Sequence, residues 1–432
     1  MYIVNIIFGI IQIILIGFIL YDEVNKKSSA VFLWATLLLM FGLPHLVAAI
    51  TLDKEYSVDV LVDASVFVTL FCLLYIVFRR KRPVDYVRLS DTDFTIVNTE
   101  VNCTEFEIFC VVIFVASIVL YMMDFAASQG GLLNTSWGNA RTVSESYVNL
   151  SGLATRIIFA FSGIPLYLFM TKRRCPALII AVLLVLMVLL TRNRVQIIPV
   201  LAFPIALMLL KIKTVKPRHI LMAGFMAVAV IYIVYGIRAF RWLGTLQHAL
   251  DTFTFDYLNR QILEFLQNQD GELGLRRIFY QFIDNDNQYD GFNQGATYLR
   301  MLLVFIPSKL TFGLKPESFD LTMGRAIGMA EGGSTHPTLF GDCFGNLGWY
   351  GILLGIFWAE FCNIVDYIIE RQPDDFFKVM IYFLATYAYV VMGRGSVYNG
   401  FQVLAWGILI LYVFRLFLSK ATMKKIEIGY YI

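Results

Sequence analysis

Eleven apolar segments, each about as long as a membrane-spanning helix, constrain the fold of this chain more than any other feature. They cover residues 2–20, 30–50, 59–78, 106–126, 153–170, 176–191, 195–211, 219–238, 346–365, 377–393 and 399–418. A helix needs roughly 20 mainly apolar residues to cross a bilayer, and it satisfies its backbone hydrogen bonds internally. Only 16% of the residues are charged, whereas about 25% are charged in soluble domains. The sequence therefore predicts an all-α polytopic membrane protein with about eleven transmembrane helices.

The positions of lysine and arginine predict how these helices are oriented. Cytoplasmic loops of membrane proteins collect both residue types. Basic residues gather in segments 26–27, 79–82, 172–174, 211–218 and 415–425. With the N-terminus outside and eleven spans, all five segments lie on the cytoplasmic side, and so does the C-terminus.

Two longer segments then fall on the outer side of the membrane. Residues 127–152 form the shorter one, and residues 239–345 form a large loop. Within that loop, residues 246–267 have apolar side chains at helical spacing, which predicts an amphipathic helix. Residues 298–310 are apolar but too short to span, which favours a half-buried or re-entrant piece. The chain thus divides into eight helices over 1–238, the loop over 239–345, and three helices with a cytoplasmic tail over 346–432.

Three arginines break the charge rule that the other basic residues follow. Arg192 and Arg194 lie in "LLTRNRVQII" (189–198), and Arg394 lies in "MGRGSVYNG" (392–400). All three are expected on the outer side, next to membrane spans, where an ionisable group is a functional-site hypothesis by default. The planar guanidinium grips phosphate with two parallel hydrogen bonds. These residues predict a site for a lipid phosphate or pyrophosphate. The alternative is a short turn whose arginines reach for the lipid headgroups.

A histidine on the same side is the first candidate for a catalytic base. His336 lies in "EGGSTHPTLFGDCFGNLGWYGILLG" (331–355), where the large loop meets the ninth span. Histidine accepts a proton from a hydroxyl near neutral pH. Glu331 and Asp342 are the other candidates. The alternative for His336 is a loop residue that is hydrogen-bonded to the backbone, and the alternative for the glycines is close helix packing.

The sequence gives little support for a metal site. The six cysteines and four histidines show no metal-ligand spacing. The acidic stretch "DNDNQYDG" (284–291) lacks the glycine and glutamate that a calcium loop requires at positions 289 and 295. We expect no metal, no other cofactor and no nucleic-acid partner.

Several short motifs resemble those of the Wzy-type O-antigen polymerases of bacteria. These are "LLTRNRVQII" after a long apolar span, "VFIPSKLTFGLKP" (304–316), "HPTLFGDCFGNLGWYG" (336–351) and "GRGSVYNGF" (393–401). The span number and the single large outer loop are also similar. The spacing from His336 to Gly348 and Gly351 resembles the related O-antigen ligases as well, but Pro337 departs from the ligase pattern.

The resemblance implies a fold, a reaction and a location. The fold would be GT-C-like, and the protein would lie in the bacterial inner membrane with its site facing the periplasm. Donor and acceptor would be glycans linked to undecaprenyl pyrophosphate, and a chain-length regulator protein and membrane lipids would be partners. His336 would act as the base, with Glu331 and Asp342 as alternatives. The pyrophosphate or glycan would be held by Arg192, Arg194, Arg394, Arg241, Arg276 and Arg277.

Two rival functions stay open at this stage. An O-antigen ligase would use the same donor chemistry with a different acceptor. A polysaccharide transporter or flippase would have charged residues deep within several spans and some repeat symmetry. The spans of this chain carry few charges, with Asp63, Asp124 and Glu360 among the exceptions, and no internal repeat is evident.

Overall fold

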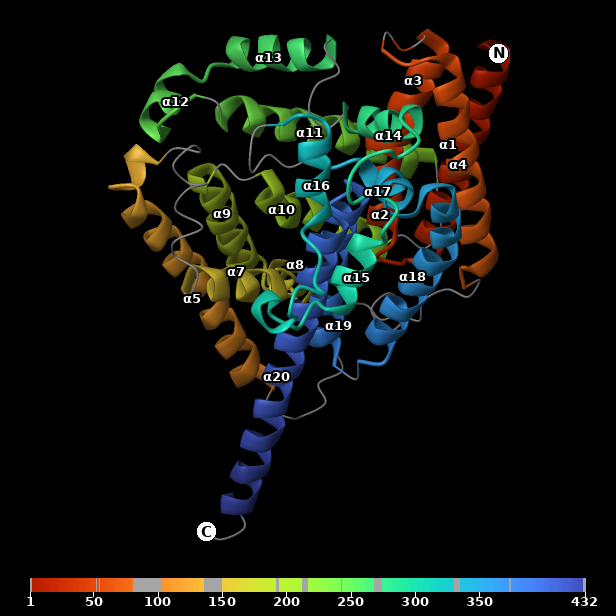
Figure 1. Cartoon of the computed structure of the whole chain (residues 1–432). Helices are drawn as coiled ribbons and strands as arrows, with labels where there is room; N and C mark the ends of the chain where they lie inside the picture. Colours follow the sequence, from red (N-terminus) through yellow and green to blue (C-terminus); the bar gives the residue numbers. More distant parts are fainter. Residues whose placement is uncertain are drawn as a thin grey trace. The chain divides into compact units, whose positions relative to one another are not determined.

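A computed structural model describes most of the chain. The described residues are 2–51, 53, 55–80, 103–135, 150–191, 194–211, 217–241, 243–267, 274–329, 335–372 and 374–429. Within them every regular element is a helix (Figure 1).

Nine of the predicted spans correspond to helices that are long and apolar enough to cross a membrane. Among the described residues these are Tyr2–Lys26, Val31–Thr51, Val58–Phe78, Phe106–Ser128, Gly152–Met170, Arg174–Thr191, Thr338–Glu370, Asp375–Gly393 and Val397–Leu416. On the first of them Ile3 and Ile14 are largely exposed, as expected for side chains that face lipid. The chain is therefore an all-helical polytopic membrane protein. The other two predicted spans coincide with shorter apolar stretches, Ile198–Leu210 and Gly224–Phe240, so the number eleven stays a prediction.

The chain forms two compact units. Unit 1 comprises residues 1–86, 265–371 and 385–402, and unit 2 comprises the rest. The helices of unit 1 are α1 (Tyr2–Lys26), α2 (Val31–Leu37), α3 (Leu43–Thr51), α4 (Val58–Phe78), α14 (Leu275–Asp284), α15 (Ala296–Leu302), α16 (Phe319–Ala326), α17 (Thr338–Leu347) and α18 (Leu354–Glu370). Helices α19 (Asp375–Gly393) and α20 (Val397–Gly429) contribute residues to both units.

Unit 2 contains the middle of the chain. Its helices are α5 (Cys103–Ser128), α7 (Leu150–Ala160), α8 (Ile164–Met170), α9 (Arg174–Thr191), α10 (Ile198–Lys211), α11 (Pro217–Arg241), α12 (Leu246–Thr252) and α13 (Phe255–Gln267). The amphipathic helix predicted over 246–267 is present but divided, because α12 ends before Phe253 and α13 starts at Phe255. On α13 Ile262 is buried while Phe255 and Leu263 are exposed.

The core of unit 1 is a cluster of aromatic side chains. Phe71 of α4 packs against Phe340 of α17 with ring centroids 5.3 Å apart, and Phe67 packs against Phe344 at 5.4 Å. Trp34 of α2 completes the layer around Phe340. Aromatic pairs of this kind stabilise a core beyond the effect of the area they bury.

The apolar segment Thr338–Glu370 contains two helices, α17 and α18, and the predicted span 346–365 corresponds mainly to α18 and the turn before it. Gly348 has φ 57° and ψ −140°, a conformation that glycine adopts far more readily than other residues, and α17 ends there. A short 3-10 helix, Gly348–Leu353, leads into α18. Along α17, Phe340 and then Phe344 meet α4 at Phe71 and then Phe67, so α17 runs towards the start of α4.

Helix α18 runs in the opposite direction. Gly355 lies so close to Phe71 that a Cβ atom there would be 2.5 Å from the carbonyl oxygen of that residue. Two turns later, the Asn363 amide donates to the Phe78 carbonyl over 3.2 Å. Helix α18 therefore runs along α4 towards the C-terminus of α4, opposite in direction to α17.

Candidate functional site

The structure brings together the two segments that carry His336 and Arg394. The Thr338 amide donates to the Arg394 carbonyl oxygen over 3.1 Å. Gly395 has φ 101°, and a Cβ atom there would lie 2.5 Å from the Thr338 nitrogen. His336 and Arg394 are both half-buried. The start of α17 and the turn between α19 and α20 thus form one local structure, which we call the α17 start site (residues 336–338 and 394–396).

The first residue of α17 is strained and incompletely bonded. Thr338 has φ 67°, which is a genuine outlier for a β-branched residue. Its side chain is fully buried, and its hydroxyl has no hydrogen-bond partner among the described residues. Strain of this kind costs on the order of 1–3 kcal/mol and tends to occur at functional sites.

The amides that follow add a positive end to the site. Pro337 precedes the helix and provides no side-chain cap. Within the described part of the chain, no acceptor pairs with the amides of Leu339 or Phe340. Free N–H groups and the helix dipole make a helix start attractive to anions.

The end of α19, which directly precedes residues 394–396 of the α17 start site, packs against α2. A Cβ atom on Gly393 would lie 3.0 Å from Thr36 of α2. The site therefore sits within the helical part of unit 1.

Asp342, the alternative base, belongs to a separate buried cluster. It accepts from the Thr297 hydroxyl at 3.3 Å and from the Asn346 amide at 3.2 Å. Asn346 also accepts from the Thr297 backbone amide at 2.9 Å. Because these bonds join α15 to α17, they give Asp342 a structural role.

Arg276 and Arg277, proposed as ligands from the sequence, contact carboxylates instead. Both lie on α14, and both approach Asp53, at 3.6 Å and 3.9 Å. Arg277 also bonds to Glu55 at 3.2 Å. Their charges are therefore compensated, and the pairs hold the loop between α3 and α4 against α14.

A buried hydrogen-bond chain lies next to these pairs. Tyr280 of α14 lies 2.5 Å from Nδ1 of His45, whose Nε2 lies 2.7 Å from the Ser65 hydroxyl. Burial raises the pKa of the Tyr280 phenol above its ordinary value, so the phenol stays protonated. All three side chains are fully buried, so the chain ties α3, α4 and α14 together.

The structure does not describe the remaining predicted ligands. Arg192 and Glu331 lie outside the described residues, as do the side chains of Arg194 and Arg241. The residues on either side of the "RNR" segment, Thr191 and Gln196, are hydrogen-bonded within unit 2. The Thr191 hydroxyl donates to Gln196 at 2.6 Å, and the Gln196 amide donates to Tyr121 at 3.1 Å.

Sequence reasoning missed two cations close to the α17 start site. The Arg300 guanidinium carbon lies 4.5 Å from the ring centre of Tyr398, and the Lys315 ammonium lies 5.9 Å from it. Tyr398 is in the first turn of α20, four residues after Arg394. A signal was available, because residues 291–316 contain three cations and no carboxylate.

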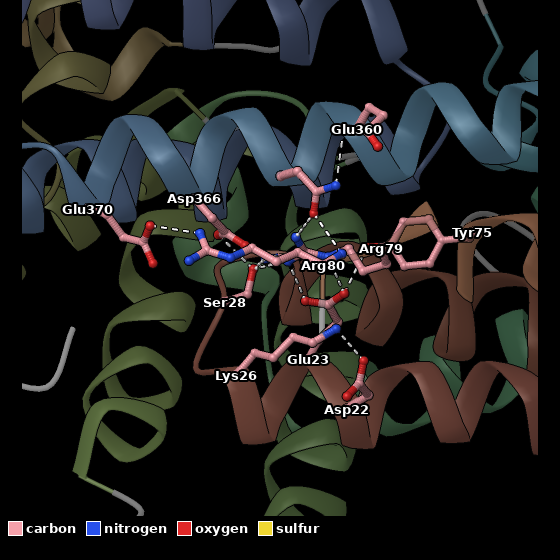
Figure 2. A network of polar contacts seen from close by, with 12 residues as sticks. Asp22, Glu23, Lys26, Ser28, Tyr75, Arg79, Arg80, Glu360, Asp366 and Glu370 are labelled. Carbon is pink, nitrogen blue, oxygen red and sulfur yellow. Dashed lines mark hydrogen bonds and ion pairs between the residues drawn. The ribbon is translucent and has the colours of Figure 1, made fainter. Parts of the chain in front are cut away.

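A buried ionic network, drawn in Figure 2, lies at the C-terminal end of α4. Arg79 bonds to both oxygens of Glu23, at 2.7 and 2.8 Å, and to Asp366 and Ser28. It also donates to Asn363 at 2.6 Å. The sequence predicted Arg79 as part of a basic cytoplasmic loop. The structure shows that Arg79 is a buried arginine that joins α1, α4 and α18, and its side of the membrane stays a prediction.

Comparisons with known proteins add no relative. No protein-family model, no curated protein and no solved structure matches this chain. Within the described residues, no group of three histidine, cysteine or acidic side chains could hold a metal ion.

Proposed function

We propose that this protein is a glycosyltransferase that polymerises oligosaccharide repeat units linked to polyprenyl pyrophosphate at the outer face of the bacterial inner membrane. The observation that carries the proposal is the α17 start site. It combines a histidine, an arginine, an unbonded hydroxyl and a free helix start inside an apolar helical unit. A substrate that is both anionic and anchored in lipid suits a site of this composition within an apolar helical unit.

The chemistry follows from the residue types. An acceptor hydroxyl attacks the anomeric carbon of the donor glycan, and the bond from that carbon to the pyrophosphate oxygen breaks. The hydroxyl proton passes to the His336 imidazole, a role worth about 10²–10⁴-fold in rate. Polyprenyl pyrophosphate leaves with the negative charge. Arg394 and the start of α17 stabilise that charge, and removing one such donor typically costs about 2.7–4 kcal/mol of transition-state stabilisation.

The test is the surface polysaccharide of cells in which the gene is deleted and then restored as variants. The deletion should leave single repeat units in place of a polymer ladder. Polymer that accumulates on its carrier lipid would identify a ligase, and repeat units stranded inside the cell would identify a flippase. A normal ladder would refute the proposal.

Variants then connect the function to the site. Arg394→Ala should abolish the ladder, and Arg394→Lys should restore it only in part because lysine lacks the fork. Arg325→Ala is the matched control, since Arg325 is exposed and pairs with Glu317. His336→Gln should fail as His336→Ala does. If glutamine supports polymer formation, His336 only orders the loop.

A further inference from the structure

Residues 302–318, from the last residue of α15 to the start of α16, expose several large apolar side chains. Leu302, Phe312 and Leu314 are 82%, 94% and 72% exposed. The segment contains only a short 3-10 helix, Ser308–Leu310, and Figure 1 shows it as the teal chain between α15 and α16. Side chains of this size and number are stable beside lipid chains and unfavourable in water.

Two cations, one near each end of this segment, donate hydrogen bonds to backbone carbonyls within it. Arg300 donates to the Pro316 carbonyl at 2.5 Å, and Lys315 donates to the Ile306 carbonyl at 2.9 Å. Both also approach the Tyr398 ring. The cations are therefore held in place by backbone carbonyls and by one aromatic face, and each keeps donors that these contacts do not use.

The positive charge of this pair is not compensated. Among the described residues, neither Arg300 nor Lys315 forms an ion pair, and the Nε atom of Arg300 is buried without a partner. The nearest acid in sequence, Glu317, is engaged by Arg325. Two fixed cations beside an apolar surface attract an anion, and a phosphate accepts the several N–H bonds that a guanidinium offers.

We propose that Arg300, Lys315 and the ring of Tyr398 form a binding site for the phosphate headgroup of a membrane lipid. The acyl or isoprenoid chain of that lipid lies on Leu302, Phe312 and Leu314. The apolar side chains select a lipid over a free anion, and the cations select a phosphate over a neutral headgroup. The site needs no glycosyl transfer, so it stands independently of the proposed function.

The test is lipid binding to the purified full-length protein in detergent, measured by native mass spectrometry. The probes are dioleoyl phosphatidic acid, dioleoylglycerol, which lacks the phosphate, and inorganic phosphate, which lacks the chains. Wild-type protein should bind phosphatidic acid and neither of the other two. Equal binding of dioleoylglycerol would mean that only the apolar surface acts. Equal binding of inorganic phosphate would mean a simple anion site. Either result overturns the proposal.

Variants separate the cations from the general charge of the segment. Arg300→Gln and Lys315→Gln should each weaken phosphatidic acid binding by about tenfold, since each removes a charge-assisted contact. Lys309→Gln is the matched control, because Lys309 is exposed in the same segment and should leave binding unchanged. Phe312→Ser should weaken phosphatidic acid binding as well.

Further variants distinguish a loss of lipid binding from a loss of folded protein. Lys315 is half-buried, so Lys315→Gln keeps the test valid if Arg300→Gln reduces the yield of folded protein. Arg300→Lys should retain part of the affinity. Equal affinities of Lys315→Gln, Lys309→Gln and wild type would refute the site.

Discussion

Replacing Arg79 by alanine should destabilise unit 1 more than any other single charge substitution. Arg79 is 3% exposed, and it is the cation that Glu23 and Asp366 share in the described network. Both carboxylates are completely buried. The alanine variant leaves them facing each other without a cation, because Ser28 and Tyr75 contribute only hydroxyl groups.

The magnitude follows from this burial. Breaking a buried ion pair by removing one partner costs about 3–5 kcal/mol, since the remaining charge stays in a medium of low polarity. Arg79→Lys should retain part of this stability, because it keeps the charge but loses the fork. Adding Glu23→Gln and Asp366→Asn to Arg79→Ala should recover stability, because the uncompensated charges are then gone.

The assay is unfolding of the purified protein in mixed detergent micelles titrated with SDS. Arg80→Ala is the matched control, because Arg80 is 34% exposed and forms a single ion pair with Glu370. This pair is only half-buried, so its loss should cost less than the loss of the buried network; a fully exposed pair contributes about 0–1 kcal/mol. Equal losses for Arg79→Ala and Arg80→Ala would refute the reasoning.

The remaining predictions concern the α17 start site and the topology. Gly395→Ala should abolish polymer formation, because its Cβ would collide with the Thr338 amide. Gly313→Ala is the control, because Gly313 also has a positive φ of 85° but no atom within 4 Å; it should show the backbone strain alone and keep more polymer formation, and equal activities would contradict the importance of the contact with Thr338. Asp342→Asn should keep polymer formation while Asp342→Leu lowers stability; loss of polymer in a stable Asp342→Asn protein would instead assign the base role to Asp342. In a background without Cys103 and Cys175, Glu55→Cys should react with an impermeant thiol reagent from outside and Arg371→Cys should not. The reverse result would overturn the predicted orientation.

The sequence predicted the spans well because hydropathy is a local property. Nine apolar helices coincide with predicted segments, since each must satisfy the same length and composition wherever it packs. The reversal of chain direction between α17 and α18 was not predicted, for the same reason. Hydropathy stays high across Thr338–Glu370. The end of α17 depends on the backbone angles of one residue, Gly348, and the sequence does not distinguish this glycine from its neighbours, which close helix packing explains equally well.

The candidate site was predictable only in part. The motifs pointed to His336 and Arg394, whose segments do meet, because each stands out within a few residues of sequence. The compensation of Arg277 by Glu55, 222 residues earlier, has no local signal. Arg79 and Asp366 are 287 residues apart. No local pattern in the sequence therefore indicates that Arg79 forms a buried ion pair.

The two ionic clusters of unit 1 also limit how many times the chain crosses the membrane. Arg79 follows α4 and pairs with Asp366 near the end of α18, so the intervening chain crosses an even number of times. Arg276 pairs with Asp53, which requires an even number between those residues as well. Eleven spans satisfy both conditions, and so do nine spans without Ile198–Leu210 and Gly224–Phe240. Ten spans satisfy neither, because the loss of one of those helices alone would place the partners on opposite sides. If both ion pairs join residues on one side of the membrane, the two shorter helices either both cross it or both do not. In either case residues 336–338 and 394–396 keep the orientation that the basic segments predict.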